Sequence, residues 1–140
     1  MVQLKQVNNH LKFKIMDKEY VMHVAQTIKE QLLSFTPMPV FLSWGVSEFV
    51  ATVFRELPAL RLKVNGRLHA GYVVIALNGS DYYEVYLQQE DDKAKCVNEE
   101  VCFDELGDVI DQAVESGTDK KEYDRFCDQQ FAMLLNGIPA

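Results

Sequence analysis

Residues 59–88 constrain the fold more than any other part of the sequence. They alternate apolar and polar side chains and are interrupted twice by Asn-Gly, at Asn65-Gly66 and at Asn78-Gly79. An Asn-Gly pair readily adopts the positive backbone φ angles that tight hairpin turns require. The stretch therefore predicts three antiparallel strands joined by two short turns, a β-meander.

The register of these strands decides which side chains share a face, because a shift of one residue moves every side chain to the opposite face. A two-residue turn at Asn65-Gly66 pairs Leu62 with His69. A three-residue second turn pairs Tyr72 with Tyr86, whereas a two-residue turn there would bring a glutamate onto the apolar face. The predicted buried face consists of Leu60, Leu62, Val64, Val73, Ile75, Leu77, Tyr83, Val85 and Leu87. The predicted opposite face consists of Arg61, Lys63, Leu68, Ala70, Tyr72, Val74, Ala76, Tyr82, Glu84 and Tyr86.

The 140 residues are 48% apolar and 25% charged, which is the composition of one globular domain with a core of its own. No apolar run approaches the roughly 20 residues of a membrane span, and the first ten residues lack the apolar segment of a signal peptide. The three cysteines cannot all pair within one chain and form no CxxC motif. We therefore expect a cytoplasmic protein with free thiols, no zinc ribbon and no membrane contact.

The net charge of −7 is distributed unevenly. Residues 1–89 hold nine Lys/Arg and seven Asp/Glu, whereas residues 90–140 hold five and fourteen. An acidic C-terminal part argues against non-specific binding to nucleic acid or to anionic membranes. A local basic patch on the sheet remains compatible with this distribution.

The segments before the meander predict a strand, a helix and further strands. Residues 11–15 alternate as a half-buried strand does, and Asp17 is placed to cap a helix whose apolar positions recur at three- and four-residue spacing. Pro37 and Pro39 end that helix. Residues 40–44 are β-prone, and residues 47–54 fit either a strand or a short helix; we favour a strand because both neighbours are extended.

The segments after the meander predict a possible edge strand over residues 94–97 and two helices. Asp104 is placed to cap the first helix, which Gly117 ends. The second begins at Thr118 or Asp119 and ends at Gly137 and Pro139. Its apolar seam consists of Tyr123, Phe126, Cys127, Phe131 and Leu134. The whole pattern predicts a single α+β domain over residues 1–140, with about five antiparallel strands and three helices packed mostly on one face.

Residues 42–86 contain a recognisable order of motifs: Ser43-Trp44-Gly45, Leu60-x-x-Lys63-Val64-Asn65-Gly66, His69-x-Gly71 and Asn78-Gly79-x-Asp81-x-Tyr83. In this order the chain resembles small uncharacterised proteins of bacterial mobile elements and phages. The resemblance implies no activity, cofactor or catalytic residue. It favours an accessory protein that acts on a component of the host or of the element.

The sequence contains no motif for cofactor binding or catalysis. It has neither a phosphate-binding loop nor a dinucleotide fingerprint, and Ser43 does not lie in a GxSxG elbow. His10, His23 and His69 are scattered, which argues against a metal site, and Trp44 is expected in the core. We expect no cofactor, no metal and no assigned catalytic residue. An enzyme with a dispersed site near His69 is one alternative that we keep.

Two surfaces are candidate binding sites. The first is the aromatic and basic face of the sheet, where tyrosines beside cations suit protein contacts; its residues are Arg61, Lys63, Tyr72, Tyr82 and Tyr86. A helix could instead cover this face. The second is an acidic stripe at helical spacing, Asp104, Asp108, Asp111 and Glu115, which could imitate phosphates and occupy a nucleic-acid-binding partner. Our first hypothesis is a non-enzymatic module that binds a protein or its own copy, and the acidic decoy is an alternative.

Overall fold

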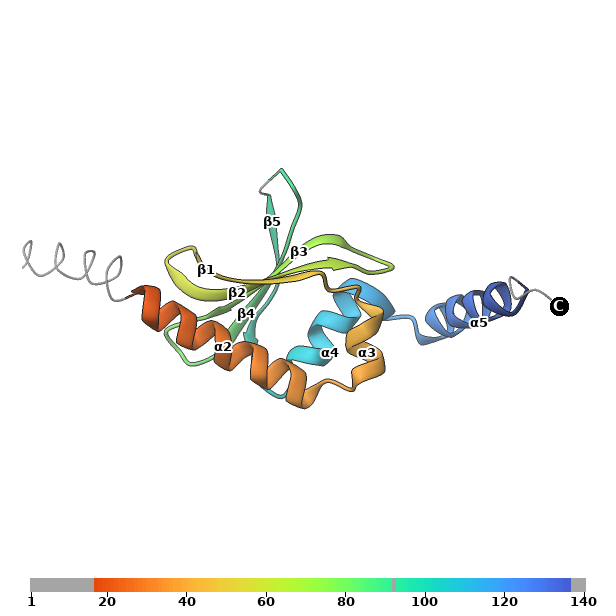
Figure 1. The fold of residues 1–140 in the computed structure, drawn as a ribbon, viewed down its shortest axis with the longest axis horizontal. Helices are drawn as coiled ribbons and strands as arrows, with labels where there is room; N and C mark the ends of the chain where they lie inside the picture. Colours follow the sequence, from red (N-terminus) through yellow and green to blue (C-terminus); the bar gives the residue numbers. More distant parts are fainter. Residues whose placement is uncertain (1–16, 92, 137–140) are drawn as a thin grey trace, which may run out of the picture.

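A computed structural model of the chain describes residues 17–91 and 93–136. Five consecutive strands form one antiparallel sheet in the order β1-β2-β3-β4-β5, so the predicted α+β meander is confirmed (Figure 1). The predicted strand over residues 11–15 lies outside the described residues. The elements are α2 (Asp17–Phe35), α3 (Met38–Ser43), β1 (Glu48–Phe54), β2 (Leu57–Asn65), β3 (Ala70–Leu77), β4 (Tyr83–Gln88), β5 (Ala94–Val101), α4 (Leu106–Asp111), the π-helical turn η1 (Gln112–Ser116) and α5 (Lys120–Asn136).

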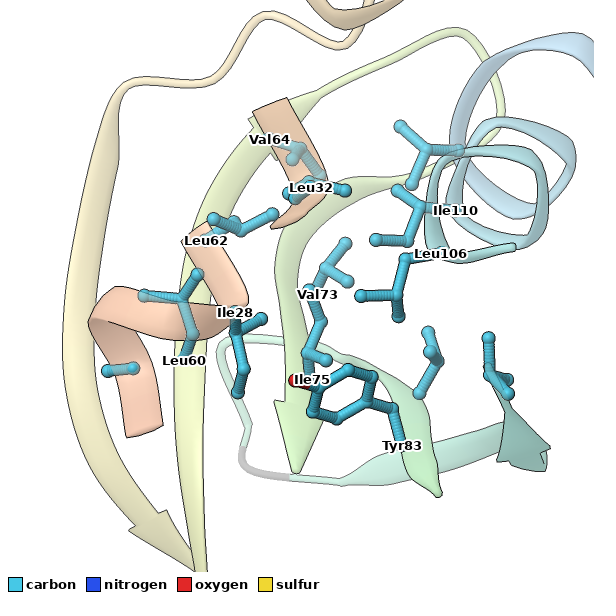
Figure 2. Close-up of a cluster of buried hydrophobic side chains, with 14 of the residues drawn as sticks. Ile28, Leu32, Leu60, Leu62, Val64, Val73, Ile75, Tyr83, Leu106 and Ile110 are labelled. Atoms are coloured by element: carbon cyan, nitrogen blue, oxygen red, sulfur yellow. The ribbon is translucent and has the colours of Figure 1, made fainter. Parts of the chain in front are cut away.

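The core lies between one face of the sheet and helices α2 and α4. Figure 2 shows Ile28 and Leu32 of α2 directed at the inward side chains of β2 and β3, with Leu106 and Ile110 of α4 beside them. Full burial of a side chain of this size contributes roughly 1.5–3 kcal/mol to stability. The predicted buried face of the meander is confirmed, since seven of its residues belong to this core and Leu77 and Leu87 pack against its edge.

The strand partners differ from the predicted ones, although the faces do not. Leu62 pairs with Val73 rather than with His69, and Tyr72 pairs with Gln88 rather than with Tyr86. Both loops are longer than predicted by an even number of residues, and the side-chain period of a strand is two. Each side chain therefore keeps its predicted face while it gains a different neighbour.

The Asn-Gly pairs do not form the tight turns that their sequence suggests. Within the described residues, neither Gly66 nor Gly79 has a positive φ. The tight two-residue hairpin instead joins β1 to β2 through Arg55 and Glu56, whose φ angles are +49° and +66°. Glycine is needed at position 66 for space, because a Cβ there would lie 2.5 Å from the backbone oxygen of Val114.

Two of the shorter segments differ in their outcome. Residues 48–54 form strand β1, so our preference for a strand is confirmed. The predicted strand over residues 40–44 is wrong, because Met38–Ser43 forms helix α3. Pro37 occupies the N-cap and Pro39 lies in the first turn. Backbone N–H groups in the first turn have no partner within the helix, so the missing N–H of proline costs no hydrogen bond there, and its fixed φ suits a helix. The two prolines therefore begin a helix as well as ending α2.

The helices near the C-terminus also depart from the predicted pattern. Asp104 does not cap α4, which begins at Leu106 after a turn closed by the hydrogen bond from the Cys102 N–H to the Glu105 carboxylate. Gly117 ends η1 as predicted, with a φ of +73°. Helix α5 has no buried residue and extends away from the sheet, so this helix is not packed on the core face (Figure 1).

We expect Gly66→Ala to destabilise the chain by about 1–3 kcal/mol, because the added methyl group must displace Val114. Gly79→Ala is the matched control, since a Cβ at position 79 meets nothing within 4 Å. Chemical unfolding of both variants measures the difference. Equal stability of the two variants would contradict the close approach at Gly66.

Candidate interaction surfaces

The predicted aromatic and basic sheet face is partly buried by side chains of the sheet's own β1–β2 hairpin. Tyr86 is only 3% exposed and packs against Phe54, with ring centroids 4.7 Å apart, while Ala59, Val74 and Ala76 are buried around it. Its cover comes from the β1–β2 hairpin, and not from α2, which packs on the opposite face. Lys63 and Tyr82 are exposed, whereas Arg61 is half-buried.

Cations on this face lie over its tyrosine rings. The guanidinium of Arg55 lies 4.8 Å from the ring centre of Tyr86, and that of Arg61 lies 4.5 Å from the ring centre of Tyr72. Burial raises the pKa of Tyr86 to about 12, and its hydroxyl donates a 2.6 Å hydrogen bond to the Glu84 carboxylate. The two cation–π pairs stabilise this face, and the buried Tyr86 is one of its structural residues.

We expect Tyr86→Ala to lower the free energy of unfolding by about 3 kcal/mol or more, since it removes a buried aromatic side chain. Tyr72→Ala removes a half-buried ring at the edge of the same face and should cost clearly less. Denaturant titration of both variants provides the measurement. Comparable losses would show that the two rings are buried alike.

The predicted acidic stripe is divided between two roles. The Asp111 carboxylate accepts a 2.9 Å hydrogen bond from the indole N–H of Trp44, which is fully buried as expected. Glu115 is 7% exposed, and its carboxylate accepts the backbone N–H of Arg67 at 2.7 Å. The other two carboxylates, Asp104 and Asp108, are exposed. The four do not share one solvated face, because Asp104 precedes helix α4 and Glu115 is buried in η1.

Arg67 joins the β2–β3 loop to η1 and to the start of α5. Its side chain donates hydrogen bonds to the backbone oxygens of Glu115 at 2.9 Å and Ser116 at 3.0 Å, and it forms an ion pair with Glu122 at 3.1 Å. The guanidinium also lies 5.3 Å from the ring centres of Tyr123 and of Phe126. One planar cation therefore holds the first two turns of α5 against the domain.

Tyr123 completes this attachment. The pKa of Tyr123 is raised above the usual tyrosine value, and burial is the largest cause. A hydrogen bond with the Cys127 side chain and the negative charge of Glu115 raise it further. Its hydroxyl lies 3.4 Å from the Glu115 carboxylate. The neutral phenol is thus the form that this site favours, which keeps a second negative charge away from Glu115.

We expect Arg67→Ala to destabilise the chain by about 2–3 kcal/mol, because two carbonyls and a carboxylate lose a charged donor together. Arg67→Lys should recover only part of this loss, since an ammonium group cannot reproduce the planar fork. Arg125→Ala, on the exposed side of α5, is the control. Thermal and chemical unfolding test the series, and full recovery by lysine would contradict the geometric role of the guanidinium.

Beyond its anchored start, α5 presents an open apolar surface, which we call the α5 seam. Its four side chains are each more than half exposed: Phe131, Met133, Leu134 and Leu135. Phe131 and Leu134 continue the side of the helix that carries Tyr123 and Phe126, and Met133 and Leu135 flank that side. The helix has 17 residues and is roughly 26 Å long. Most of the stability of a helix in a protein comes from packing of its apolar side, and the exposed part of α5 has no such packing within the described residues.

A second exposed apolar surface, the α2–α3 patch, lies where α2 ends. It consists of Phe35, Met38, Leu42 and Phe103, each about half exposed or more. Phe35 and Phe103 contact one another edge to face, with ring centroids 5.3 Å apart, and Met38 and Leu42 are one turn apart on α3. Contiguous exposed apolar side chains of this size are typical of protein-binding surfaces.

The remaining candidate residues serve structural roles. His69 is 6% exposed, and its ring nitrogen lies 3.1 Å from the Tyr72 backbone oxygen. A hollow of about 620 Å³ lies beside the ends of β2 and β3, and His69 is not among the residues that line it. The Ser43 hydroxyl donates to the backbone oxygen of Val40 within α3. None of these side chains is arranged as a nucleophile with its base.

The three cysteines, Cys96, Cys102 and Cys127, are free and exposed. The hydrogen bond to Glu105 raises the pKa of Cys102, and partial loss of hydration at the thiol raises the pKa of Cys96, so both thiols favour the less reactive protonated form. Ligand atoms of Cys102, Asp104 and Glu105 approach one another within 4.8 Å. The Glu105 carboxylate closes the turn before α4, which accounts for the cluster without a metal ion.

Of the residues that define these surfaces, the sequence predicted Phe131 and Leu134 on the apolar side of the last helix, but not Arg67 or the α2–α3 patch. Arg67 directly follows the predicted Asn65-Gly66 turn, and nothing in the neighbouring sequence indicates its contacts with Glu115 and Glu122, which are 48 and 55 positions further along the chain. A signal for the two apolar surfaces does exist in the sequence. Residues 31–47 and 129–136 contain no charged side chain, although a quarter of the chain is charged.

Comparisons with known proteins add no assignment: no protein-family model, curated protein or solved structure matches the chain. Among the described residues, no helix has the length and apolar character that are needed to cross a membrane.

Proposed function

We propose that the chain is a non-enzymatic protein-interaction domain and that α5 is its contact element. The observation that carries this proposal is the α5 seam, four large apolar side chains left open on a helix without a buried residue. An amphipathic helix recognises a protein groove through apolar side chains at three- and four-residue spacing. The seam offers this arrangement on a helix whose start is fixed by Arg67.

The sheet face has a supporting role in this proposal. Lys63 and Tyr82 are exposed and could widen a contact, whereas Tyr86 is occupied within the fold. The acidic-decoy alternative has weaker support, because Asp111 and Glu115 bind partners inside the domain. The enzyme alternative has weaker support too, because His69 does not line the hollow beside β2 and β3.

The proposed setting is the cytoplasm, where three exposed free thiols would stay reduced. The resemblance of residues 42–86 to small proteins of mobile elements and phages supports an accessory role there. In that role the domain would act by occupying or assembling with a protein, without a reaction of its own.

Affinity capture from the native cell, combined with cross-linking, tests the role of the seam. Phe131→Glu combined with Leu134→Glu places two charges in the seam and should reduce every specifically captured polypeptide at least tenfold, copies of the chain included. Gln129→Glu combined with Asn136→Glu adds the same charge to the polar side of α5 and should capture as the unchanged chain does. Equal capture by the seam variant would contradict α5 as the contact element.

A further inference from the structure

We propose that the partner of the α5 seam is the α2–α3 patch of a second copy, so that two chains exchange their C-terminal helices in a closed dimer. This inference rests on the proposed function and names its partner. Each chain contains both halves of the contact: the protruding helix and an open apolar patch on the domain. A two-fold axis would form the same contact twice and leave neither surface free.

The charge distribution favours a second copy over a charged foreign surface. The seam lies in residues 129–136 and most of the patch lies in residues 31–47, and neither range contains an ionisable side chain. Two copies that each carry a net charge of −7 repel one another wherever charged surfaces meet. These charge-free regions are where two copies can meet without that repulsion.

The attachment of α5 explains why the seam does not close on the patch of its own chain. Arg67 fixes the start of α5 through Glu122, Tyr123 and Phe126. The rest of the helix then leads away from α2 and α3 (Figure 1). A partner placed along α5 can supply the patch that the helix cannot reach.

The area available matches a stable interface. Side chains of this size expose roughly 200 Å² when free of contacts, so the seam and the patch of one chain leave roughly 800 Å² open. A pair of chains can therefore bury up to roughly 1,600 Å² of these side chains, which reaches the standard size of a stable protein–protein interface. Pairing of the two seams alone would bury only about half of this area.

Sedimentation velocity of the purified full chain, over a range of micromolar concentrations, tests the dimer. The unchanged chain should form dimers and nothing larger. The seam variant, Phe131→Glu with Leu134→Glu, and a patch variant, Met38→Glu with Leu42→Glu, should each raise the dissociation constant at least roughly a hundredfold. Met22→Glu, at an exposed apolar position of α2 outside the patch, should leave the dimer unchanged.

Mixing the two variants identifies the exchange. In a mixture, the intact seam of the patch variant can bind the intact patch of the seam variant, so one of the two contacts is restored. We expect a heterodimer that is weaker than the original dimer but absent from either variant alone. Circular dichroism establishes that each variant is folded, and Leu42→Gln replaces the patch variant if the double change unfolds the chain.

Three results would overturn this proposal. A monomeric unchanged chain excludes the second copy as partner, and the capture experiment then decides separately whether α5 binds another protein. A patch variant that dimerises like the unchanged chain shows that seam pairs with seam. A mixture that stays monomeric shows that seam and patch do not bind one another.

Discussion

The apolar face of the five-stranded meander has room for one layer of helices, and in this chain α2 and α4 form that layer. Their apolar side chains fill the space over β2, β3 and β4, where the central side chains are fully buried. The opposite face is closed around Tyr86 by the β1–β2 hairpin. The domain therefore buries its own apolar sheet surfaces without α5, and the apolar side of that helix stays exposed.

Arg67 fixes the start of α5, and with it the direction in which the helix leaves the domain. Its guanidinium binds the end of η1 and the first turns of α5 together, and the buried Glu115 carboxylate binds the backbone of the same loop. A flexible tail with the same seam would lose conformational entropy on binding. A helix already fixed at one end loses less, so the attachment supports recognition as well as stability.

The sequence predicted the faces of the meander because side-chain alternation survives any even change in loop length. It did not predict the loop lengths, since Gly66 and Leu68 are placed by contacts with Val114 from a distant segment. The apolar run of α3 is too short for its hydrophobic periodicity to distinguish a strand from a helix. Phe131 and Leu134 were predicted on the apolar side of this helix, but their exposure depends on what the rest of the fold has already covered.

Hydrogen exchange measured at two protein concentrations tests the central claim most directly, that the α5 seam is packed by a second molecule and not by its own domain. The account predicts that amides in residues 128–136 exchange rapidly in dilute solution and become protected at high concentration, together with those of α3. Amides of β2 and β3 should stay protected throughout. Strong protection of residues 128–136 that does not depend on concentration would contradict the account, because the seam would then be packed within a single chain.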